Sequence, residues 1–179
     1  MLFLQKKTEN KINIMETIKL TTKQYLKTLT IINFALIIGQ VLFGVIVIYL
    51  TLNGFDGAKD STFENVFTYL LPIVTFGGLI ASIFVYKKKI SLINYNKDLY
   101  SVLTEYRSAL ITRYALLEAP SFLALVVTLL TGNFMFLIYA GLMILCTIYW
   151  RPTKNSILKD LELSQKHITI LDDPDAILN

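Results

Sequence analysis

The sequence predicts an all-α membrane protein with four transmembrane helices. Of its 179 residues, 54% are hydrophobic, and the mean hydropathy is +0.56. Four long segments are almost free of charge, and such segments are typical of helices that cross the roughly 30 Å hydrocarbon core of a bilayer. The predicted spans are residues 28–52, 66–86, 114–131 and 134–150.

The first helix should begin ahead of its hydrophobic part. Thr21 and Gln24 have the spacing of a capping box, which places the helix start near Thr22. Residues 1–21 are therefore expected to be a cytoplasmic N-terminal segment, within which Met15 is an alternative start.

The segment between the second and third spans, residues 87–113, is expected to be helical as well. Four apolar residues recur there every three or four positions, as on one helix face: Leu99, Leu103, Tyr106 and Leu110. The sequence Asn94–Lys97 suits a turn. We therefore predict a cytoplasmic helical hairpin extension, with a third helix that runs from Lys97 to Thr131.

The fourth span is short, and it should pack against the third. Only Gly132 and Asn133 separate the two, so they are expected to be antiparallel neighbours. Trp150 ends the span with a side chain suited to the membrane interface. Beyond it, residues 151–179 should contain a short cytoplasmic helix. Pro152 can occupy its first turn, and Ile157, Leu158 and Leu161 form its apolar face. An acidic tail, either flexible or docked in extended form, should follow.

The charged residues predict the orientation. Residues 1–27 carry six Lys and two Glu, residues 87–113 carry six basic and two acidic residues, and residues 53–65 carry one Lys and three acids. The positive-inside rule then places both termini and the central hairpin in the cytoplasm, which in a bacterium means insertion in the inner membrane. Because the basic residues flank the spans, the net charge of +4 indicates the lipid bilayer, and not nucleic acid, as the partner.

A repeat is concealed in the spans. After a shift of 80 residues, residues 34–53 align with residues 114–133, and after a shift of 64 the second span aligns with the fourth. In the first alignment, six residues are identical to the residue 80 positions later: Ala35, Leu36, Val47, Leu50, Thr51 and Asn53. The pattern favours two duplicated, parallel helical hairpins. An alternative is chance agreement between two leucine-rich helices.

Glu118 is the one acidic or basic residue inside a predicted span. A charged carboxylate in the middle of a membrane is unfavourable by about 2.5–3.5 kcal/mol, and such residues often carry function. It forms either an ion or proton site or a structural hydrogen bond between helices. Five polar residues are its candidate partners: Gln40, Asn33, Tyr114, Thr75 and Ser121.

Two resemblances add to this interpretation. The sequence LLEAPSFLALVV, Leu116 to Val127, resembles the carboxylate-bearing helix of rotary-ATPase c-subunit proteolipids, which implies an acid that exchanges H⁺ or Na⁺. Those proteolipids carry their acid in the second helix of a hairpin, whereas here it lies in the first. The whole chain, including KQYLKTLTII and WRPTK, resembles an uncharacterised family of four-helix bacterial integral membrane proteins, from which no activity follows.

The sequence predicts neither an enzyme nor a cofactor. It contains no Ser–His–acid set, phosphate loop or dinucleotide fingerprint, and the single His167 and single Cys146 do not predict a metal site. We therefore expect a non-enzymatic subunit or scaffold of a membrane complex, either a homo-oligomer or a partner of other membrane subunits. The alternative is a proton- or Na⁺-translocating, proteolipid-like or transport subunit that uses Glu118.

Overall fold

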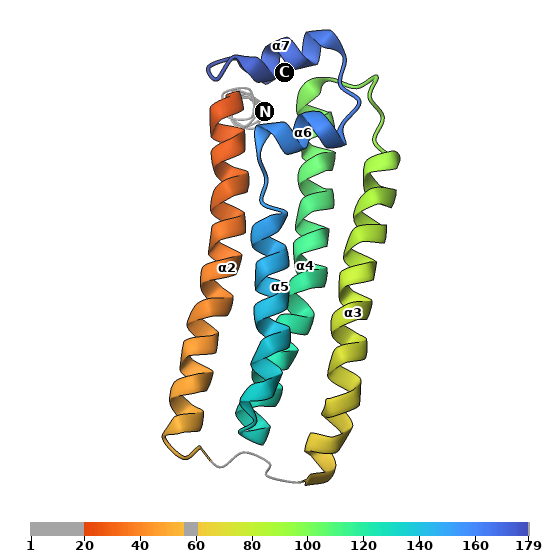
Figure 1. Cartoon of the computed structure of the whole chain (residues 1–179). Helices are drawn as coiled ribbons and strands as arrows, with labels where there is room; N and C mark the ends of the chain where they lie inside the picture. The colour runs from red at the N-terminus through yellow and green to blue at the C-terminus, as the bar shows by residue number, and fades with distance from the viewer. Residues whose placement is uncertain (1–19, 56–60, 179) are drawn as a thin grey trace, which may run out of the picture.

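Over the residues that the computed structural model describes, 20–55 and 61–178, the protein is all-α. Long antiparallel helices form a bundle, and two short helices lie across one end of it (Figure 1). The elements are α2 (Thr22–Leu52), α3 (Ser61–Ser91), α4 (Leu99–Thr131), the 3₁₀ helix η1 (Phe134–Phe136), α5 (Leu137–Tyr149), α6 (Lys154–Asp160) and α7 (Gln165–Asp172). We call the end that carries α6 and α7 the capped end. The predicted segment around Met15 and the middle of the 53–65 loop lie outside the described residues.

Three helices, α2, α3 and α4, are long and apolar enough to cross a membrane. The fourth predicted span meets the same standard only when it is taken together with α6, from which it is bent by 84°. On their own, η1 and α5 extend about 25 Å, because a 3₁₀ residue rises about 2.0 Å and an α-helical residue about 1.5 Å. The described chain therefore has three such helices, or four if the bent pair is one span.

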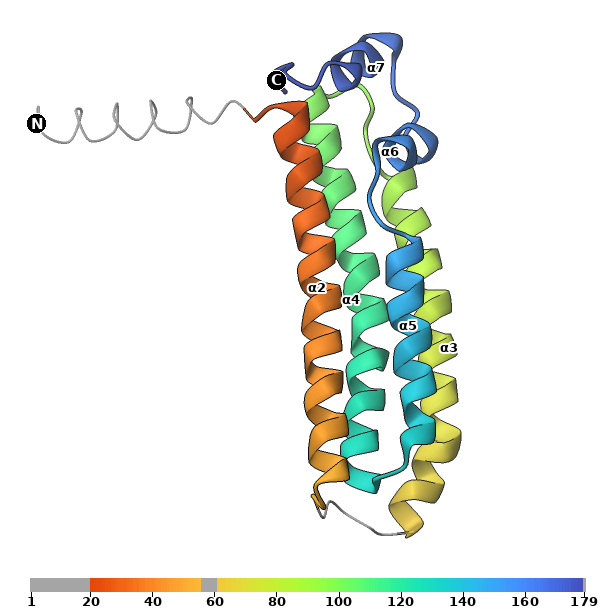
Figure 2. The same cartoon turned by 60° about the vertical axis from the view of Figure 1, so that its left-hand side comes forward.

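Helix α4 is the centre of the bundle. It packs against α2, α3 and α5, most extensively against α3, and it buries side chains along most of its length. Helices α2 and α3 flank the α4–α5 pair (Figure 1; Figure 2). Both leave many large apolar side chains exposed. Such outer faces suit contact with lipid tails or with another membrane helix.

Helix α3 lies close against α4 at a glycine. A Cβ atom on Gly78 would lie 2.6 Å from Pro120 Cγ and 3.0 Å from Leu116 O. Any larger residue at this position would push the two helices apart. Small residues serve this purpose in membrane helix pairs.

The start of α2 and the end of α4 follow the sequence signals. Thr21 and Gln24 form both bonds of the predicted capping box, and α2 begins at Thr22. Gly132 ends α4 in the left-handed conformation, with φ of 72°, and its N–H donates to Thr128 O at 2.9 Å. The tight turn predicted at Gly132 and Asn133 is therefore confirmed.

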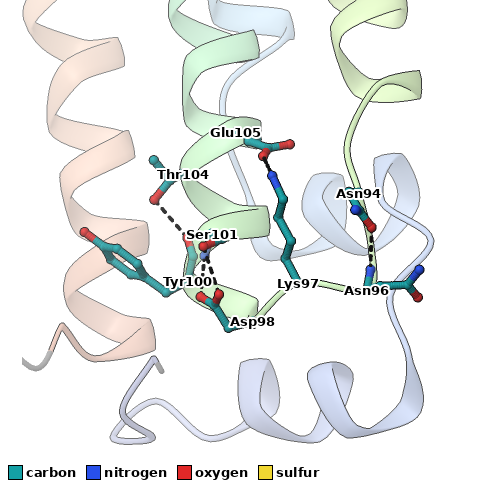
Figure 3. A network of polar contacts seen from close by, with 8 residues as sticks. All are labelled: Asn94, Asn96, Lys97, Asp98, Tyr100, Ser101, Thr104 and Glu105. Atoms are coloured by element: carbon teal, nitrogen blue, oxygen red, sulfur yellow. Dashed lines mark hydrogen bonds and ion pairs between the residues drawn. The ribbon is translucent and has the colours of Figure 1, made fainter.

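The connection between α3 and α4 contains the predicted Asn94–Lys97 turn (Figure 3). Helix α4 begins two residues later than predicted, because Asp98 is its N-cap. The carboxylate of Asp98 accepts hydrogen bonds from Ser101 N and Ser101 Oγ, both at 2.9 Å. The bond from the Ser101 backbone is the main reason that the pKa of Asp98 lies below its usual value. Lys97 Nζ also pairs with Glu105 Oε1 at 2.6 Å.

Two predictions about the C-terminal part are wrong. Pro152 precedes α6 instead of occupying its first turn, because Thr153 is the N-cap and accepts a hydrogen bond from Ser156 N at 3.1 Å. The acidic tail contains a helix, α7, which Ser164 caps. Lys154 Nζ joins the two short helices by an ion pair with Asp172 Oδ1 at 2.6 Å.

The residues after α7 dock in extended form against the start of α2, as one of the two alternatives predicts. Thr22 N donates to Ala176 O at 3.1 Å, and Lys23 N donates to Pro174 O at 3.0 Å. Leu178 N donates in turn to Leu20 O at 3.0 Å. The first N–H groups of a helix lack partners within the helix, so the tail supplies carbonyl groups that α2 needs.

Candidate functional site

Three of the predicted polar residues are completely buried, each on a different helix. Gln40 of α2 is 1% exposed, and Thr75 of α3 and Ser121 of α4 are 0% exposed. Gln40 Nε2 donates to Leu36 O at 3.4 Å. The side-chain oxygens of all three residues lack a hydrogen-bond partner among the described residues, which is unusual for buried polar groups.

Helix packing brings Gln40 and Ser121 to one level of the bundle. A Cβ atom on Gly44 would lie 3.5 Å from Leu125 Cδ2, so α2 and α4 are in contact there. The two helices run in the same direction from the capped end (Figure 1). Gln40 precedes Gly44 by four residues, and Ser121 precedes Leu125 by four, so both lie about 6 Å along the axis from this contact.

Thr75 reaches the same level from the other side of α4. Helix α3 runs opposite to α4 and meets it where Gly78 lies against Leu116 and Pro120. Thr75 lies about 4.5 Å further from the capped end than Gly78, which places it level with Ser121. The structure thus brings these three predicted residues to one height, Ser121 on α4 itself and Gln40 and Thr75 on the two helices that pack against it.

Glu118 lies one turn from Ser121 on α4, toward the capped end, and its side chain is half-buried. Its carboxyl group makes no hydrogen bond or ion pair with any residue that the structure describes. The carboxyl group is therefore close in height to three unpaired oxygens, yet none of them is its partner.

The other two candidate partners, Asn33 and Tyr114, bond elsewhere. Asn33 Nδ2 donates to Thr147 O at 3.4 Å, and Tyr114 has a partner at the end of α5. Tyr114 lies one turn from Glu118 toward the capped end and is 2% exposed. Its hydroxyl donates to Trp150 O at 3.0 Å, which joins α4 to the end of α5. Its observed role is to hold the short fourth segment against the central helix.

A second polar site, which the sequence did not predict, is a pocket at the capped end. Its volume is about 580 Å³, and its walls come from α3, α4, α6 and the residues that end α5. We call it the capped-end pocket. Four basic residues line it: Lys87, Arg113, Arg151 and Lys159. Four aromatic residues line it too: Tyr86, Tyr106, Tyr149 and Trp150.

Arg113 is the buried cation of this pocket. Only 8% of the residue is exposed, and its guanidinium carbon lies 3.8 Å from the ring centroid of Trp150 and 4.5 Å from that of Tyr86. Contacts with both rings stabilise the charge by cation–π attraction. Its Nε atom has no hydrogen-bond partner among the described residues.

One hydrogen bond closes the pocket wall. Tyr86 Oη of α3 donates to Asp160 Oδ2 of α6 at 2.6 Å. It connects the end of a membrane-length helix to the short helix that lies across the bundle. In the sequence, Arg113 has the position of an ordinary charge at the membrane boundary. The signal that could have identified the pocket is the aromatic residue at the end of the second and of the fourth predicted span, Tyr86 and Trp150.

No protein-family model matches the chain, and the comparisons with curated proteins and with solved structures gave no match. The arguments about function therefore depend on the sequence and the geometry alone.

Proposed function

We propose that the protein is a non-enzymatic, multi-pass membrane subunit or scaffold that associates with a second copy of itself or with other membrane subunits. The observation that carries this proposal is Glu118. A carboxyl group in an apolar helix needs a polar partner, and that of Glu118 has none among the described residues. A helix from another subunit can supply that partner, since polar side chains join helices in membranes.

The outer faces of α2 and α3 support the same proposal. Large apolar side chains on both helices are exposed, and so are positions where helices could approach closely. A Cβ atom on Gly39 or Gly77 would meet nothing within 4 Å. Glycine on an open face permits close contact with a further helix.

The proposed setting is a bacterial inner membrane with both termini and the α3–α4 turn in the cytoplasm. The excess of basic residues in residues 87–113 supports this orientation. The capped end would then face the cytoplasm, and the α3–α4 hairpin, α6 and α7 would form a cytoplasmic extension. The duplicated-hairpin origin belongs to the same proposal, and its support is the alignment of residues 34–53 with residues 114–133.

A variant series tests the association. The full chain would be purified in mild detergent, and its mass measured by sedimentation equilibrium. We expect an oligomer, or a complex with co-purified membrane proteins. Glu118→Leu should weaken it by about five- to thirtyfold, because a membrane hydrogen bond contributes about 1–2 kcal/mol. Glu118→Gln should retain most of the association.

Glu105→Gln is the matched control for that series. Glu105 lies on the same helix but is exposed and paired with Lys97, so its neutralisation should leave the mass unchanged. A wild-type protein that remains monomeric at all concentrations and co-purifies with no other membrane protein would contradict the proposal.

One observation favours a second candidate, ion translocation. The oxygens of Gln40, Thr75 and Ser121 have no described partners, and they lie close in height to Glu118. A carboxylate together with neutral oxygens is the ligand chemistry that hard cations take. In this alternative Glu118 exchanges H⁺ or Na⁺, as the proteolipid resemblance implies. In that case, Na⁺ would protect Glu118 from chemical modification.

A further inference from the structure

The capped-end pocket combines an excess of positive charge with an apolar wall. Four cations and two acids, Asp160 and Glu162, line it, and Asp160 already accepts the hydroxyl of Tyr86. We propose that this pocket binds a phosphate group carried by an anionic phospholipid. The proposal concerns a site separate from Glu118, and it does not depend on the protein being a scaffold.

The cations are available for a ligand. Among the described residues, none of Lys87, Arg151 and Lys159 takes part in an ion pair, and all three are exposed. Each comes from a different part of the chain: the end of α3, the residue after Trp150, and α6. The fold therefore brings Lys87 close to two cations that lie more than sixty residues later in the sequence, and their combined field attracts an anion.

Arg113 supplies the directional contact. It lines the pocket and is more than nine-tenths buried. Its Nε atom is buried as well and has no hydrogen-bond partner in the described chain. A buried unpaired donor is unfavourable. The planar guanidinium matches the geometry of a phosphate group and binds it through two parallel hydrogen bonds. The rings of Trp150 and Tyr86 hold the guanidinium in place.

The remaining walls indicate a lipid as the source of the phosphate. Ile83, Ile90 and Leu110 line the pocket beside the aromatic residues. A volume of about 580 Å³ lies in the range of about 300–1,000 Å³ that is usual for ligand pockets. The site lies where α3 and α5 end their apolar segments, at the height expected for headgroups if these segments cross the bilayer. A ligand with an anionic head and an apolar tail satisfies both kinds of wall.

Trp150 gives the experiment a built-in reporter, because it is the only tryptophan of the chain. The full-length protein, delipidated in zwitterionic detergent, would be titrated with short-chain phosphatidylglycerol, with short-chain phosphatidylcholine and with glycerol 3-phosphate. Trp150 fluorescence would report binding, and native mass spectrometry would count the bound lipids. We expect saturable binding of phosphatidylglycerol, and phosphatidylcholine binding at least tenfold weaker.

Three single neutralisations complete the design. Lys87→Gln and Arg151→Gln should each weaken phosphatidylglycerol binding about fivefold, the factor that corresponds to the loss of one basic residue near an anionic headgroup. Lys88→Gln is the control, because Lys88 is the exposed neighbour of Lys87 and does not line the pocket. It should bind like the wild type. All three substitutions are at exposed positions, so folding is not expected to change.

Equal affinity for the two lipids would overturn the proposal, and so would equal binding by all three variants. Glycerol 3-phosphate that binds as tightly as phosphatidylglycerol would overturn the lipid assignment and leave a site for a soluble phosphate compound.

Discussion

Gly77 and Gly78 are adjacent in α3, yet they face different surroundings. A methyl group on Gly78 would collide with Pro120 and the carbonyl of Leu116, whereas one on Gly77 would meet nothing within 4 Å. The first glycine is exposed to the surroundings of the bundle, and the second sets the distance between α3 and α4.

Alanine substitutions should separate these two roles. Gly78→Ala is expected to lower the free energy of unfolding by about 1–3 kcal/mol, the usual effect of overpacking. Gly77→Ala should be neutral or should raise it by up to about 1 kcal/mol through helix propensity. Unfolding of the detergent-solubilised protein by added SDS measures both. Equal effects of the two substitutions would contradict the described α3–α4 contact.

The sequence predicts some residues of the two polar sites and not others. Glu118 stands out in the sequence because any charge in an apolar run is conspicuous. The depth of Gln40, Thr75 and Ser121 follows from which helix faces pack together, and the sequence of one helix does not contain that information. Arg113 resembles an ordinary boundary charge, and its burial depends on Tyr86 and Trp150, which come from other elements.

The short elements of the capped end form a packed core of their own. Ile157 of α6 is 0% exposed and Leu171 of α7 is 1% exposed. Both belong to one buried cluster with Tyr25 of α2 and with Leu103 and Tyr106 of α4. The short helices therefore fasten the beginnings of α2 and α4 together.

Truncation of Ile157 tests this fastening. Ile157→Ala is expected to lower the free energy of unfolding by about 2–5 kcal/mol, because a large buried side chain leaves a cavity. Ile177→Ala is the control at the same end of the bundle. Ile177 is 40% exposed, so its loss should have a clearly smaller effect. Thermal unfolding followed by Trp150 fluorescence gives the comparison, and similar shifts for both variants would refute a packed capped end.

Elements with strong local signals are predictable, and those that depend on tertiary contacts are not. Apolar runs and the caps at Thr21 and Gly132 place α2, α3 and α4 to within a few residues. Helix α7 escapes prediction because its eight residues carry only Leu171 as a fully buried anchor. Pro152 is compatible with a first helical turn, but Thr153 is the better N-cap and moves the start to Lys154.

The whole molecule has, over its described residues, three or four helical segments that could cross a membrane. Three helices are sufficient by length and composition, and the fourth segment is bent by 84° where it meets α6. With four crossings, the turn before η1 and the start of α6 lie on opposite sides of the membrane. With a re-entrant fourth segment they lie on the same side.

Cysteine labelling distinguishes these two topologies. In a Cys146→Ser background, single cysteines would replace Phe55, Asn96, Met135 and Asn155, all at exposed positions. Four crossings with the positive-inside orientation predict that a membrane-impermeant maleimide labels positions 55 and 135 in intact cells. Positions 96 and 155 should react only after lysis. Labelling of positions 135 and 155 from one side would exclude the fourth crossing.

The most direct test of the proposed role is the reactivity of Glu118 toward a membrane-permeant carbodiimide. The reagent would be applied to intact membranes and to protein dissociated into monomers by detergent, with mass spectrometry to locate the adduct and Glu118→Gln as control. If the carboxyl group of Glu118 contacts another subunit, Glu118 should be protected from the reagent in membranes and labelled after dissociation. Equal labelling in both states would contradict that account, and protection that requires Na⁺ would favour ion translocation instead.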